Sequence, residues 1–239
     1  MMTITGRVHI SPDAESLARA AAESMVTRIN CGRKIFRLAL SGGSTPRLLY
    51  RLLASPEFAS HIPWQNVELF WGDERFVPWE HKDSNFRMVR ETLLSNPVVA
   101  PRLINAIPTD TTLEDCATRY ETTLREYYGA STINPEQPFF DCVLLGLGAD
   151  GHTASLLPRQ PVLNERASWV AGVAQGRDEP RITLTYPILE SSRAVMFLVA
   201  GADKAEAVRR VRTGDTNLPA ARLKPHGETV WFLDQAAAQ

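Results

Sequence analysis

The stretch FRLAL at residues 36–40, followed directly by SGGSTP at residues 41–46, decides the fold of this chain. The first five residues form a short, mostly apolar run with turn residues behind it, which is typical of a buried strand. The glycine-rich turn then leads into a helix that the pattern predicts over residues 46–53. A strand, a glycine turn and a helix in that order favour an α/β protein with a mostly parallel sheet.

Amphipathic helices recur on both sides of this stretch. Ser11 and Pro12 predict the cap and the first position of a helix whose apolar stripe runs from Leu17 to Ile29. Ser84 predicts the cap of another helix. Apolar positions at helical spacing predict two more helices over residues 113–127 and 205–211.

Further strands are expected at residues 67–71, 139–147, 169–173, 194–199 and 229–233, and the last of these is expected to close the sheet. The pattern between residues 158 and 187 is otherwise weak. We therefore expect a single α/β domain over residues 1–239, with an open, mostly parallel, Rossmann-like sheet and helices on both faces.

Composition places the chain among ordinary globular proteins. It has 239 residues, of which 44% are hydrophobic and 22% charged, enough for one core without disulfides or metals. Three cysteines without a CxxC pair suggest free thiols in a reducing compartment, and we expect a cytoplasmic protein. The first sixteen residues contain no apolar core of a targeting signal. No apolar run is long enough to span a bilayer, so no membrane partner is expected.

The charge balance argues against one class of partner. Lys and Arg number 26 and Asp and Glu number 27, for a net charge of −1. A protein dedicated to nucleic acid usually carries a basic excess, so no nucleic-acid partner is expected. A local basic pocket for one small anion remains compatible with this balance.

Four predicted strands end in unusual polar sequences: SGGSTP at 41–46, GDER at 72–75, GADGH at 148–152 and GADK at 201–204. The carboxyl ends of parallel strands meet at one edge of the sheet, where ligands of open α/β proteins bind. The four sequences are therefore expected to lie around one site.

The glycine turn has the chemistry of an anion site. Gly42 and Gly43 allow close approach of the backbone, and the following helix offers free N–H groups and its positive dipole end. Ser41, Ser44 and Thr45 add hydroxyl donors. The turn is no Walker A loop, because no Gly-Lys-Ser/Thr follows. A tight structural turn with a Ser/Thr cap is the alternative interpretation.

A second glycine motif, GxGxxG at residues 146–151, suggests an alternative fold for dinucleotides. Asp150 stands where a pyrophosphate would approach and would repel it. Pro158 shortens any following helix, and no strand ending in a ribose-binding acid is evident about 20 residues on. These features argue against an NAD-dependent enzyme.

His152 is the strongest candidate for catalysis. Imidazole titrates near neutrality and can take a proton from water, and Asp150, two residues earlier, can orient the ring. A histidine that merely caps a helix is the alternative. The other four histidines have no metal-ligand spacing, so no catalytic metal is expected.

Charged residues near two other strand ends extend the candidate site. Arg75 and Lys204 are suited to neutralising a phosphate. Asp73 and Glu74 are candidates for binding hydroxyl groups or for pairing with Arg75. The alternative for each is a solvated loop charge. Arg181 is not placed by any pattern.

These residues resemble the 6-phosphogluconolactonase family, which is itself similar to the glucosamine-6-phosphate deaminases. The matching stretches are SGGSTP, WGDERFVP at 71–78, GLGADGHTASLLP at 146–158, RIT at 181–183 and WFLD at 231–234. The resemblance implies the open α/β fold of the deaminases and hydrolysis of 6-phospho-D-glucono-1,5-lactone in the pentose phosphate pathway, without cofactor or metal. The substrate, a small sugar-phosphate lactone, is the expected partner.

The resemblance also implies roles for the site residues. His152 is expected to activate water as general base, with Asp150 supporting it. Arg75, Lys204 and the 41–45 turn are expected to hold the 6-phosphate, and Arg181 to stabilise the developing oxyanion. Asp73 is expected to bind the substrate on the strength of its own chemistry, as a candidate acceptor for hydroxyl groups. Leu157 stands where the deaminases carry a catalytic glutamate, which disfavours deamination. The alternatives are an isomerase or deaminase of this fold and a non-catalytic sugar-phosphate sensor domain.

Overall fold

A seven-stranded sheet forms the centre of the structure, a computed structural model that describes residues 6–239. Its strand order is β1-β10-β9-β6-β2-β3-β5, and every neighbouring pair is parallel. The strands are β1 (Arg7–Ser11), β2 (Phe36–Leu40), β3 (Val67–Trp71), β5 (Leu103–Asn105), β6 (Cys142–Leu145), β9 (Ala194–Val199) and β10 (Glu228–Asp234). Residues 1–5 lie outside the described residues; they belong to the stretch in which no targeting signal is expected.

A second, three-stranded sheet lies beside the large one. It consists of β4 (Asp73–Arg75), β8 (Arg181–Leu184) and β7 (Val170–Val173), paired antiparallel in the order β4-β8-β7. Two of its strands come from residues 158–187, where the sequence pattern is weak. The predicted strand at residues 169–173 therefore exists as β7 but belongs to this small sheet, and β8 was not expected.

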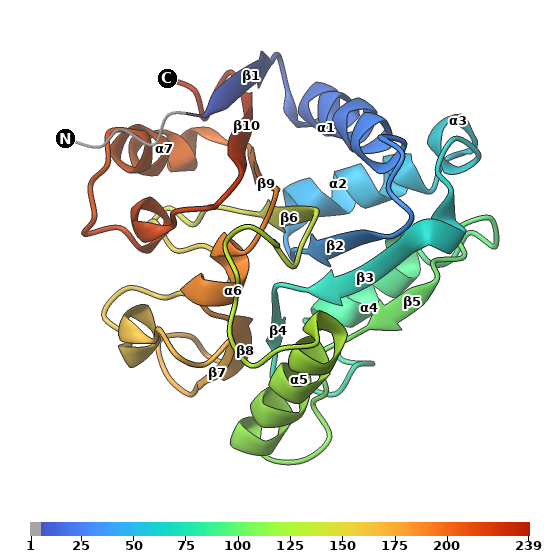
Figure 1. The fold of residues 1–239 in the computed structure, drawn as a ribbon. Coiled ribbons are helices and arrows are strands. Elements are labelled where there is room, and N and C mark those ends of the chain that lie inside the picture. The colour runs from blue at the N-terminus through green and yellow to red at the C-terminus, as the bar shows by residue number, and fades with distance from the viewer. Residues whose placement is uncertain (1–5) are drawn as a thin grey trace.

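Helices cover both faces of the large sheet, which confirms the expected fold class. In Figure 1, α1 (Ala14–Ile29) and α2 (Ser44–Leu53) lie side by side on one face, and α5 (Leu113–Tyr128) lies on the other. Tyr127 of α5 meets Phe70 of β3 edge-to-face at 5.9 Å. The remaining helices are α3 (Pro56–Ala59), α4 (Asn85–Thr92), α6 (Tyr186–Glu190) and α7 (Ala205–Arg212).

Several predicted element ends were wrong by a few residues. The first helix begins at Ala14 with Asp13 as its cap, because the Asp13 carboxylate accepts from the backbone N–H of Ser16 at 2.7 Å. Ser11 instead ends β1, an edge strand that the sequence did not reveal, so β10 is internal and does not close the sheet. The helix after the glycine turn begins at Ser44, two residues before the predicted start.

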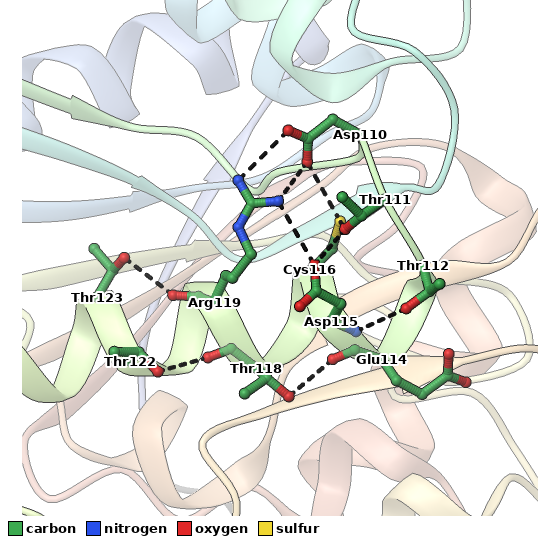
Figure 2. Close-up of polar contacts among 10 residues, drawn as sticks. All are labelled: Asp110, Thr111, Thr112, Glu114, Asp115, Cys116, Thr118, Arg119, Thr122 and Thr123. Carbon is green, nitrogen blue, oxygen red and sulfur yellow. Dashed lines mark hydrogen bonds and ion pairs between the residues drawn. The ribbon is translucent and has the colours of Figure 1, made fainter.

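The long helix α5 shows how local polar contacts fix a helix start (Figure 2). The Thr112 hydroxyl accepts from the backbone N–H of Asp115 at 3.2 Å, and Arg119 reaches back to Asp110 at 2.7 Å. Hydroxyl groups further along, on Thr118 and Thr122, donate to carbonyl groups one turn earlier. The cap satisfies a backbone donor that the first turn would otherwise leave free, and the ion pair ties the preceding loop to the helix.

The core is one continuous cluster around β9, whose six residues are all buried. Phe197 of β9 stacks on Trp231 of β10 with ring centroids 4.1 Å apart. From β2 the chain builds outward through β3 and β5, whereas β6 leads to β9 and β10 in the other direction. The order therefore reverses between β2 and β6, where open α/β sheets bind their ligands. Within residues 6–239, no helix is both long and apolar enough to cross a membrane.

Candidate active site

A cavity of about 370 Å³ opens at this reversal point, beyond the carboxyl ends of the strands. All four polar strand ends contribute to its wall, as the sequence predicts. Among the predicted site residues, those lining it are Ser41, Gly42, Gly43, Ser44, Thr45, Asp73, Arg75, His152, Arg181 and Lys204. Asp150 alone stands behind the wall, in contact with His152.

The glycine turn is held in place by a buried tyrosine. The Tyr50 hydroxyl of α2 accepts from the backbone N–H of Ser41 at 2.9 Å and donates to the Ser41 carbonyl at 2.8 Å. Gly43, the cap of α2, has φ 109°, which favours glycine. A Cβ on Gly42 would come within 2.0 Å of the Asn85 amide oxygen. The turn thus presents the start of α2, with no acidic residue in its first turn, to the cavity.

His152 and Asp150 form a directly bonded pair. The Nδ1 atom of His152 lies 2.5 Å from Oδ1 of Asp150. This hydrogen bond, reinforced by Arg177, holds the pKa of Asp150 well below its usual range. An ionised carboxylate only accepts, so Nδ1 carries the proton and Nε2 keeps its lone pair. No helix begins at His152, so the capping interpretation is wrong.

Arg177 completes this pair and was missed by the sequence analysis. Its Nη2 atom lies 2.7 Å from Oδ2 of Asp150 and 3.0 Å from Nδ1 of His152. Asp150 thus has one oxygen on the histidine and the other on the arginine. Arg177 also lines the cavity. The one available signal was a basic residue four positions before Arg181, in a segment without periodicity.

Pairing of β4 with β8 brings two arginines together. Arg75 stands opposite Arg181 in the antiparallel register, and both line the cavity. Burial, and next the neighbouring charge of Arg75, lower the pKa of Arg181. Arg75 also donates to the Asn85 amide oxygen, and the Asn85 amide donates to the carbonyl of Asp73 at 2.9 Å. Two adjacent guanidinium groups favour an anionic ligand between them.

The two acids of GDER have different positions. Asp73 is buried on the cavity wall and accepts from the Ser155 hydroxyl at 2.7 Å. Glu74 points away from the cavity and accepts from the backbone N–H groups of Arg75, Asn85 and Phe86 at 2.7–2.8 Å. Burial raises the pKa of Glu74 to about 7. The hypothesis that Glu74 contacts a ligand is therefore wrong, since its role is to fix the start of α4.

The remaining wall carries one cation and one apolar residue of interest. Lys204 follows β9 and pairs with the exposed Asp203 at 2.9 Å. Leu157 is 2% exposed and reaches the cavity. Within the described part of the chain, no three His, Cys, Asp or Glu side chains are grouped as metal ligands would be.

Fold and cavity together define a parallel α/β protein with a cationic crevice and a histidine–aspartate pair beside it. The chain belongs to the family of glucosamine-6-phosphate isomerases and 6-phosphogluconolactonases, whose model matches residues 12–231.

Within that family, the chain is similar to proteins named 6-phosphogluconolactonase and shares its fold with a deaminase. A 6-phosphogluconolactonase of Nostoc sp. is 37% identical over 237 residues, covering 96% of each chain. The structure of 6-phosphogluconolactonase from Thermotoga maritima superposes with a TM-score of 0.82 at 28% identity, covering 97% of this chain and 100% of that one. A monomeric glucosamine-6-phosphate deaminase, at 21% identity and a TM-score of 0.80, shares the fold.

Proposed function

We propose that this chain, as one domain over residues 1–239, hydrolyses 6-phospho-D-glucono-1,5-lactone to 6-phospho-D-gluconate, a step of the oxidative pentose phosphate pathway. The observation that carries the proposal is that one cavity joins a cationic region to a histidine whose Nδ1 is bound to a carboxylate. The relatives named 6-phosphogluconolactonase, including those of Nostoc sp. and Synechocystis sp., support this substrate.

Substrate binding begins at the phosphate. Arg75 supplies a bidentate guanidinium, Lys204 a point charge, and the turn at residues 41–45 supplies backbone N–H groups and hydroxyls at the start of α2. Asp73, already bonded to Ser155, accepts from a hydroxyl of the sugar. Gripping the distant phosphate places the lactone carbonyl beside His152.

Hydrolysis then needs one proton transfer and one stabilised charge. Nε2 of His152 takes a proton from a water molecule while the water oxygen attacks the lactone carbonyl carbon. Asp150 holds the imidazolium that forms. The carbonyl oxygen becomes an oxyanion, which Arg181 stabilises, and the intermediate collapses by breaking the ring C–O bond as the His152 imidazolium returns its proton to the ring oxygen. Base assistance contributes about 10²–10⁴-fold, and a donor to the oxyanion about 10²–10³-fold.

Deamination fits this cavity less well. Leu157 presents a buried hydrocarbon side chain to the cavity where, by the family resemblance, the deaminases carry a glutamate. A leucine transfers no proton, so the cavity lacks a proton-transferring side chain at the position that the deaminases use.

The proposed cytoplasmic location rests on cysteine usage. Cys31, Cys116 and Cys142 are all free. A relative from Arabidopsis thaliana is named chloroplastic, so the family is not confined to one compartment.

Proton release from freshly prepared lactone tests the proposal. The protein should accelerate release well above the uncatalysed rate, and ammonia release from glucosamine 6-phosphate should stay at background. A lactone rate equal to the uncatalysed one would exclude lactonase activity, and rapid ammonia release would favour the deaminase.

A further inference from the structure

A second charged cavity lies at the opposite edge of the large sheet. It measures about 580 Å³ and lies between the C-terminal half of α1 and the amino ends of β1, β10, β9, β6 and β2. We call it the amino-edge cavity; its charged lining is Arg7, Arg28, Arg33, Asp141, Arg193 and Glu228. Because the strands are parallel, their amino ends are separated from the candidate active site by the length of the sheet.

The amino-edge cavity is basic in a chain that is not. Four guanidinium groups face two carboxylates in its wall, an excess of two positive charges, whereas the whole chain carries a net −1. His9, Ser24 and Thr27 add polar groups to the same wall. The local excess favours a small anion over a cation or an apolar ligand.

Several donors in this wall are only partly used. Arg33 and Arg193 both approach Oδ1 of Asp141 through Nε, at 3.0 and 3.5 Å. Among residues 6–239, the terminal Nη atoms of these two arginines have no hydrogen-bonding partner.

Arg28, in the same cavity, also has a donor without an acceptor. Its Nη2 atom donates to Glu228 at 2.6 Å, but its buried Nε finds no acceptor within the described residues. A buried donor without an acceptor costs free energy, so an incoming anion with several oxygens gains binding energy here.

We propose that the amino-edge cavity is a second, non-catalytic binding site for a small phosphorylated anion. Planar guanidinium forks bind phosphate oxygens in pairs, and the free sides of Arg33 and Arg193 offer two such forks above one shared carboxylate. Arg28 supplies a third donor group from α1. The site is independent of the proposed lactonase site because it lies at the other end of the strands.

Cys31 provides a built-in reporter for occupancy. It is exposed and lines the amino-edge cavity, whereas Cys116 and Cys142 are buried. The experiment measures the rate of Cys31 alkylation by iodoacetamide, a neutral reagent, as pyrophosphate is titrated at constant ionic strength with KCl. We expect pyrophosphate to slow alkylation with a saturable dependence.

Variants assign the protection to the arginines. The double variant Arg33→Gln/Arg193→Gln should raise the Kd for pyrophosphate by about tenfold or more. Each lost charge-assisted contact to the anion accounts for about a tenfold change in Kd. A matched control, Arg87→Gln with Arg90→Gln, removes two arginines from exposed pairs on α4 and should leave protection unchanged. The single variants replace the double one if circular dichroism shows that it does not fold.

Two outcomes would overturn the proposal: no protection by pyrophosphate beyond that of KCl, or equal protection in the Arg33 and Arg193 variants. Arg75→Ala should retain protection of Cys31, which separates this site from anion binding in the active-site cavity. Because alkylation needs no turnover, failure here leaves the proposed lactone hydrolysis untested and unharmed.

Discussion

The two edges of the large sheet use charge differently. At the carboxyl edge, a glycine turn and the start of α2 face a cavity that also holds His152, the proposed general base. At the amino edge, α1 ends and the charges come from side chains alone, with Asp141 and Glu228 partly neutralising the arginines. Helix starts add positive potential, and turns with exposed N–H groups approach a ligand closely, so reaction chemistry belongs to the first edge and binding alone to the second.

The largest expected effect tests whether chemistry is confined to the carboxyl edge. His152→Ala should lower kcat by about 10²–10⁴-fold because it removes the proposed general base, while binding of 6-phosphogluconate survives. His226→Ala, which removes an exposed histidine near the amino edge, is the control and should be neutral. Stopped-flow proton release measures both. Near-normal turnover in His152→Ala would remove His152 from the mechanism.

The next effect separates the cations of the two edges. Arg75→Ala and Lys204→Ala should each raise KM by about tenfold to a hundredfold, because each removes a charge-assisted contact to the phosphate. Arg193→Gln at the amino edge should leave KM unchanged. Initial rates over a range of lactone concentrations give the answer, and an unchanged KM in both alanine variants would refute the phosphate assignment.

Asp150→Asn tests the role of the histidine–aspartate pair. The hydrogen bond to His152 lowers the pKa of Asp150, so the Asp150 carboxylate is ionised and accepts from Nδ1 of the ring. Removing the charge should weaken the hydrogen bond that orients the ring and the stabilisation of the imidazolium that forms during the reaction. It should also reduce kcat about tenfold, a modest loss because water reaches the half-exposed carboxylate.

The same variant should also change how the stability of the fold depends on pH. A depressed pKa means that the Asp150 carboxylate stabilises the fold above its unfolded pKa of about 3.9, and that this contribution disappears as pH falls through its folded pKa. Asn lacks the contribution at every pH. Urea unfolding at several acidic pH values measures this contribution: the stability gap between the wild type and Asp150→Asn should narrow as pH falls, and a gap independent of pH would contradict the lowered pKa of Asp150.

The smallest effect concerns Glu74, which supports the carboxyl edge without facing the cavity. Its pKa is raised to about 7, so the folded state holds a proton that the unfolded state releases from about pH 4.5 upward. The stability of the wild type should fall as pH rises from about 4.5 to 7, and then level off.

Urea unfolding at several pH values measures this. Glu74→Gln has one acceptor fewer for the three backbone N–H groups and should be less stable near pH 5, and the gap should narrow toward pH 7. Glu126→Gln, at an exposed position of α5, is the control. A gap independent of pH would show that Glu74 holds no titrating proton in this range.

The sequence by itself determined the strand–turn–helix segment and the gathering of four polar strand ends at one edge. Both follow from periodicity and from the geometry of parallel strands, which act over a few residues or over the whole sheet. His152 and the turn at residues 41–45 were found for that reason. The start of α1 was missed because two capping residues lie close together, and the hydrogen bond from Ser16 to Asp13 decides between them.

Results

Sequence analysis

The stretch FRLAL at residues 36–40, followed directly by SGGSTP at residues 41–46, decides the fold of this chain. The first five residues form a short, mostly apolar run with turn residues behind it, which is typical of a buried strand. The glycine-rich turn then leads into a helix that the pattern predicts over residues 46–53. A strand, a glycine turn and a helix in that order favour an α/β protein with a mostly parallel sheet.

Amphipathic helices recur on both sides of this stretch. Ser11 and Pro12 predict the cap and the first position of a helix whose apolar stripe extends to Ile29. Ser84 predicts the cap of another helix. Apolar positions at helical spacing predict two more helices, over residues 113–127 and 205–211.

Further strands are expected at residues 67–71, 139–147, 169–173, 194–199 and 229–233, and the last of these is expected to close the sheet. The pattern between residues 158 and 187 is otherwise weak. We therefore expect a single α/β domain over residues 1–239, with an open, mostly parallel, Rossmann-like sheet and helices on both faces.

Composition places the chain among ordinary globular proteins. It has 239 residues, of which 44% are hydrophobic and 22% charged, enough for one core without disulfides or metals. Three cysteines without a CxxC pair suggest free thiols in a reducing compartment, and we expect a cytoplasmic protein. The first sixteen residues contain no apolar core of a targeting signal. No apolar run is long enough to span a bilayer, so no membrane partner is expected.

The charge balance argues against one class of partner. Lys and Arg number 26 and Asp and Glu number 27, for a net charge of −1. A protein dedicated to nucleic acid usually carries a basic excess, so no nucleic-acid partner is expected. A local basic pocket for one small anion remains compatible with this balance.

Four predicted strands end in unusual polar sequences: SGGSTP at 41–46, GDER at 72–75, GADGH at 148–152 and GADK at 201–204. The carboxyl ends of parallel strands meet at one edge of the sheet, where ligands of open α/β proteins bind. The four sequences are therefore expected to lie around one site.

The glycine turn has the chemistry of an anion site. Gly42 and Gly43 allow close approach of the backbone, and the following helix offers free N–H groups and its positive dipole end. Ser41, Ser44 and Thr45 add hydroxyl donors. The turn is no Walker A loop, because no Gly-Lys-Ser/Thr follows. A tight structural turn with a Ser/Thr cap is the alternative interpretation.

A second glycine motif, GxGxxG at residues 146–151, suggests a dinucleotide-binding fold as an alternative. Asp150 stands where a pyrophosphate would approach and would repel it. Pro158 shortens any following helix, and no strand ending in a ribose-binding acid is evident about 20 residues on. These features argue against an NAD-dependent enzyme.

His152 is the strongest candidate for catalysis. Imidazole titrates near neutrality and can take a proton from water, and Asp150, two residues earlier, can orient the ring. A histidine that merely caps a helix is the alternative. The other histidines have no metal-ligand spacing, so no catalytic metal is expected.

Charged residues near two other strand ends extend the candidate site. Arg75 and Lys204 are suited to neutralising a phosphate. Asp73 and Glu74 are candidates for binding hydroxyl groups or for pairing with Arg75. The alternative for each is a solvated loop charge. Arg181 is not placed by any pattern.

These motifs resemble the 6-phosphogluconolactonase family, which is itself similar to the glucosamine-6-phosphate deaminases. The matching stretches are SGGSTP, WGDERFVP at 71–78, GLGADGHTASLLP at 146–158, RIT at 181–183 and WFLD at 231–234. The resemblance implies the open α/β fold of the deaminases and hydrolysis of 6-phospho-D-glucono-1,5-lactone in the pentose phosphate pathway, without cofactor or metal. The expected partner is this small sugar-phosphate lactone.

The resemblance also implies catalytic roles. His152 is expected to activate water as general base, with Asp150 supporting it, and Arg181 to stabilise the developing oxyanion. Leu157 stands where the deaminases carry a catalytic glutamate, which disfavours deamination.

Binding roles follow from the same resemblance. Arg75, Lys204 and the turn at residues 41–45 are expected to hold the 6-phosphate. Asp73 is expected to bind the substrate on the strength of its own chemistry, as a candidate acceptor for hydroxyl groups. The alternatives that remain are an isomerase or deaminase of this fold and a non-catalytic sugar-phosphate sensor domain.

Overall fold

A seven-stranded sheet forms the centre of the structure, a computed structural model that describes residues 6–239. Its strand order is β1-β10-β9-β6-β2-β3-β5, and every neighbouring pair is parallel. The strands are β1 (Arg7–Ser11), β2 (Phe36–Leu40), β3 (Val67–Trp71), β5 (Leu103–Asn105), β6 (Cys142–Leu145), β9 (Ala194–Val199) and β10 (Glu228–Asp234). Residues 1–5 lie outside the described residues; they belong to the stretch in which no targeting signal is expected.

A second, three-stranded sheet lies beside the large one. It consists of β4 (Asp73–Arg75), β8 (Arg181–Leu184) and β7 (Val170–Val173), paired antiparallel in the order β4-β8-β7. The predicted strand at residues 169–173 therefore exists as β7 but belongs to this small sheet, and β8 was not expected. In the large sheet, the strand predicted at residues 139–147 is confined to the shorter β6.

Helices cover both faces of the large sheet, which confirms the expected fold class. In Figure 1, α1 (Ala14–Ile29) and α2 (Ser44–Leu53) lie side by side on one face, and α5 (Leu113–Tyr128) lies on the other. Tyr127 of α5 meets Phe70 of β3 edge-to-face, with ring centroids 5.9 Å apart. The remaining α-helices of residues 6–239 are α3 (Pro56–Ala59), α4 (Asn85–Thr92), α6 (Tyr186–Glu190) and α7 (Ala205–Arg212).

Several predicted element ends were wrong by a few residues. The first helix begins at Ala14 with Asp13 as its cap, because the Asp13 carboxylate accepts from the backbone N–H of Ser16 at 2.7 Å. Ser11 instead ends β1, an edge strand that was not expected, so β10 is internal and does not close the sheet. The helix after the glycine turn begins at Ser44, slightly before the predicted start.

The long helix α5 shows how local polar contacts fix a helix start (Figure 2). The Thr112 hydroxyl accepts from the backbone N–H of Asp115 at 3.2 Å, and Arg119 reaches back to Asp110 at 2.7 Å. Threonine hydroxyls further along the helix donate to carbonyl groups one turn earlier. The cap satisfies a backbone donor that the first turn would otherwise leave free, and the ion pair ties the preceding loop to the helix.

The core is one continuous cluster around β9, whose residues are all buried. Phe197 of β9 stacks on Trp231 of β10 with ring centroids 4.1 Å apart. From β2 the chain builds outward through β3 and β5, whereas β6 leads to β9 and β10 in the other direction. The order therefore reverses between β2 and β6, where open α/β sheets bind their ligands. Within residues 6–239, no helix is both long and apolar enough to cross a membrane.

Candidate active site

A cavity of about 370 Å³ opens at this reversal point, beyond the carboxyl ends of the strands. All four polar strand ends contribute to its wall, as the sequence predicts. The predicted site residues that line it are Ser41, Gly42, Gly43, Ser44, Thr45, Asp73, Arg75, His152, Arg181 and Lys204. Asp150 is not part of the wall and stands behind His152, which it contacts.

The glycine turn is held in place by a buried tyrosine. The Tyr50 hydroxyl of α2 accepts from the backbone N–H of Ser41 at 2.9 Å and donates to the Ser41 carbonyl at 2.8 Å. Gly43, the cap of α2, has a φ of 109°, which favours glycine. A Cβ on Gly42 would come within 2.0 Å of the Asn85 amide oxygen. The turn thus presents the start of α2, with no acidic residue in its first turn, to the cavity.

His152 and Asp150 form a directly bonded pair. The Nδ1 atom of His152 lies 2.5 Å from Oδ1 of Asp150. This hydrogen bond, reinforced by Arg177, holds the pKa of Asp150 well below its usual range. An ionised carboxylate only accepts, so Nδ1 carries the proton and Nε2 of the neutral ring keeps its lone pair. No helix begins at His152, so the capping interpretation is wrong.

Arg177 completes this pair and was missed by the sequence analysis. Its Nη2 atom lies 2.7 Å from Oδ2 of Asp150 and 3.0 Å from Nδ1 of His152. Asp150 thus has one oxygen on the histidine and the other on the arginine. Arg177 also lines the cavity. The only available signal was a basic residue shortly before Arg181, in a segment without periodicity.

Pairing of β4 with β8 brings two arginines together. Arg75 stands opposite Arg181 in the antiparallel register, and both line the cavity. Burial, and next the neighbouring charge of Arg75, lower the pKa of Arg181. Arg75 also donates to the Asn85 amide oxygen, and the Asn85 amide donates to the carbonyl of Asp73 at 2.9 Å. Two adjacent guanidinium groups favour an anionic ligand between them.

The two acids of GDER have different positions. Asp73 is buried on the cavity wall and accepts from the Ser155 hydroxyl at 2.7 Å. Glu74 does not line the cavity and accepts from three backbone N–H groups of β4 and the start of α4, at 2.7–2.8 Å. Burial raises the pKa of Glu74 to about 7. The hypothesis that Glu74 contacts a ligand is therefore wrong, since its carboxyl group fixes the start of α4.

The remaining wall carries one cation and one apolar residue of interest. Lys204 follows β9 and pairs with the exposed Asp203 at 2.9 Å. Leu157 is 2% exposed and reaches the cavity. Within the described part of the chain, no three His, Cys, Asp or Glu side chains are grouped as metal ligands would be.

Fold and cavity together define a parallel α/β protein with a cationic crevice and a histidine–aspartate pair beside it. The chain belongs to the family of glucosamine-6-phosphate isomerases and 6-phosphogluconolactonases, whose family model matches residues 12–231.

Within that family, the chain is similar to proteins named 6-phosphogluconolactonase and shares its fold with a deaminase. A 6-phosphogluconolactonase of Nostoc sp. is 37% identical over 237 residues, covering 96% of each chain. The structure of 6-phosphogluconolactonase from Thermotoga maritima superposes with a TM-score of 0.82 at 28% identity, covering 97% of this chain and 100% of that one. A monomeric glucosamine-6-phosphate deaminase shares the fold at 21% identity, with a TM-score of 0.80 over 97% of this chain and 98% of that one.

Proposed function

We propose that this chain, as one domain over residues 1–239, hydrolyses 6-phospho-D-glucono-1,5-lactone to 6-phospho-D-gluconate, a step of the oxidative pentose phosphate pathway. The observation that carries the proposal is that one cavity joins a cationic region to a histidine whose Nδ1 is bound to a carboxylate. The relatives named 6-phosphogluconolactonase, including those of Nostoc sp. and Synechocystis sp., support this substrate.

Substrate binding begins at the phosphate. Arg75 supplies a guanidinium fork, Lys204 a point charge, and the turn at residues 41–45 supplies backbone N–H groups and hydroxyls at the start of α2. Asp73 accepts from a hydroxyl of the sugar. Gripping the distant phosphate places the lactone carbonyl beside His152.

Hydrolysis then needs one proton transfer and one stabilised charge. Nε2 of His152 takes a proton from a water molecule while the water oxygen attacks the lactone carbonyl carbon. Asp150 stabilises the imidazolium that forms. The carbonyl oxygen becomes an oxyanion beside Arg181, and the intermediate collapses by breaking the ring C–O bond as the His152 imidazolium returns its proton to the ring oxygen. Base assistance contributes about 10²–10⁴-fold, and a donor to the oxyanion about 10²–10³-fold.

Deamination fits this cavity less well. Leu157 presents a buried hydrocarbon side chain to the cavity where, by the family resemblance, the deaminases carry a glutamate. A leucine transfers no proton, so the cavity lacks a proton-transferring side chain at the position that the deaminases use.

The proposed cytoplasmic location rests on cysteine usage. Cys31, Cys116 and Cys142 are all free, as expected in a reducing compartment. A relative from Arabidopsis thaliana is named chloroplastic, so the family is not confined to one compartment.

Proton release from freshly prepared lactone tests the proposal. The protein should accelerate release well above the uncatalysed rate, and ammonia release from glucosamine 6-phosphate should stay at background. A lactone rate equal to the uncatalysed one would exclude lactonase activity, and rapid ammonia release would favour the deaminase.

A further inference from the structure

A second charged cavity lies at the opposite edge of the large sheet. It measures about 580 Å³ and lies between the C-terminal half of α1 and the amino ends of β1, β10, β9, β6 and β2. We call it the amino-edge cavity; its charged lining is Arg7, Arg28, Arg33, Asp141, Arg193 and Glu228. Because the strands are parallel, their amino ends are separated from the candidate active site by the length of the strands.

The amino-edge cavity is basic in a chain that is not. Four guanidinium groups face two carboxylates in its wall, an excess of two positive charges, whereas the whole chain carries a net −1. His9, Ser24 and Thr27 add polar groups to the same wall. The local excess favours a small anion over a cation or an apolar ligand.

Several donors in this wall are only partly used. Arg33 and Arg193 both approach Oδ1 of Asp141 through Nε, at 3.0 and 3.5 Å. Among residues 6–239, the terminal Nη atoms of these two arginines have no hydrogen-bonding partner. Both guanidinium groups therefore keep a free side for a further acceptor.

Arg28, in the same cavity, also has a donor without an acceptor. Its Nη2 atom donates to Glu228 at 2.6 Å, but its buried Nε finds no acceptor within the described residues. A buried donor without an acceptor costs free energy, so an incoming anion with several oxygens gains binding energy here.

We propose that the amino-edge cavity is a second, non-catalytic binding site for a small phosphorylated anion. Planar guanidinium forks bind phosphate oxygens in pairs, and the free sides of Arg33 and Arg193 offer two such forks around one shared carboxylate. Arg28 supplies a third donor group from α1. The site is independent of the proposed lactonase site because it lies at the other end of the strands.

Cys31 provides a built-in reporter for occupancy. It is exposed and lines the amino-edge cavity, whereas Cys116 and Cys142 are buried. The experiment measures the rate of Cys31 alkylation by iodoacetamide, a neutral reagent, as pyrophosphate is titrated at constant ionic strength with KCl. We expect pyrophosphate to slow alkylation with a saturable dependence.

Variants assign the protection to the arginines. The double variant Arg33→Gln/Arg193→Gln should raise the Kd for pyrophosphate by about tenfold or more. Each lost charge-assisted contact to the anion accounts for about a tenfold change in Kd. A matched control, Arg87→Gln with Arg90→Gln, removes two arginines from exposed pairs on α4 and should leave protection unchanged. The single variants replace the double one if circular dichroism shows that it does not fold.

Two outcomes would overturn the proposal: no protection by pyrophosphate beyond that of KCl, or equal protection in the Arg33 and Arg193 variants. Arg75→Ala should retain protection of Cys31, which separates this site from anion binding in the active-site cavity. Because alkylation needs no turnover, failure here does not bear on lactone hydrolysis, which the proton-release assay tests by itself.

Discussion

The candidate active site and the amino-edge cavity lie at opposite ends of the same strands, and their charges differ in origin. At the carboxyl edge, a glycine turn and the start of α2 face a cavity that also holds His152, the proposed general base. At the amino edge, α1 ends and the positive charges come from side chains, partly neutralised by Asp141 and Glu228. Helix starts add positive potential and free N–H groups, so we expect reaction chemistry at the first edge and binding alone at the second.

The largest expected effect tests whether chemistry is confined to the carboxyl edge. His152→Ala should lower kcat by about 10²–10⁴-fold because it removes the proposed general base, while binding of 6-phosphogluconate survives. His226→Ala, which removes an exposed histidine shortly before β10, is the control and should be neutral. Stopped-flow proton release measures both. Near-normal turnover in His152→Ala would remove His152 from the mechanism.

The next effect separates the cations of the two edges. Arg75→Ala and Lys204→Ala should each raise KM by about tenfold to a hundredfold, because each removes a charge-assisted contact to the phosphate. Arg193→Gln at the amino edge should leave KM unchanged. Initial rates over a range of lactone concentrations give the answer, and an unchanged KM in both alanine variants would refute the phosphate assignment.

Asp150→Asn tests the role of the histidine–aspartate pair. The hydrogen bond to His152 lowers the pKa of Asp150, so the Asp150 carboxylate is ionised and accepts from Nδ1 of the ring. Removing the charge should weaken the hydrogen bond that orients the ring and the stabilisation of the imidazolium that forms during the reaction. It should also reduce kcat about tenfold, a modest loss because water reaches the partly exposed carboxylate.

The same variant should also change how the stability of the fold depends on pH. A depressed pKa means that the Asp150 carboxylate stabilises the fold above its unfolded pKa of about 3.9, and that this contribution disappears as pH falls through its folded pKa. Asn lacks the contribution at every pH. Urea unfolding at several acidic pH values measures this contribution: the stability gap between the wild type and Asp150→Asn should narrow as pH falls, and a gap independent of pH would contradict the lowered pKa of Asp150.

The smallest effect concerns Glu74, which supports the carboxyl edge without facing the cavity. Its pKa is raised to about 7, so between about pH 4.5 and 7 the folded state holds a proton that the unfolded state releases. The free energy of unfolding of the wild type should fall as pH rises through this range, and then level off.

Urea unfolding at several pH values measures this contribution. Glu74→Gln has one carboxyl oxygen fewer for the three backbone N–H groups and should be less stable than the wild type near pH 5, with a gap that narrows toward pH 7. Glu126→Gln, at an exposed position of α5, is the control. A gap independent of pH would show that Glu74 holds no titrating proton in this range.

The sequence by itself determined the strand–turn–helix segment and the gathering of four polar strand ends at one edge. Both follow from hydrophobic periodicity and from the shared direction of parallel strands, and neither needs knowledge of distant contacts. The positions of His152 and of the turn at residues 41–45 were found for that reason. The start of α1 was missed because two capping residues lie close together, and the hydrogen bond from Ser16 to Asp13 decides between them.

Only the tertiary structure decided which charges meet. Arg177 reaches Asp150 from a loop 27 residues further along the chain, and Arg75 faces Arg181 because β4 pairs with β8. Glu74, a neighbour of both Asp73 and Arg75, turns instead toward the start of α4. Side-chain type and spacing leave such choices open, because each depends on the path of the intervening chain and on which buried donors still need an acceptor.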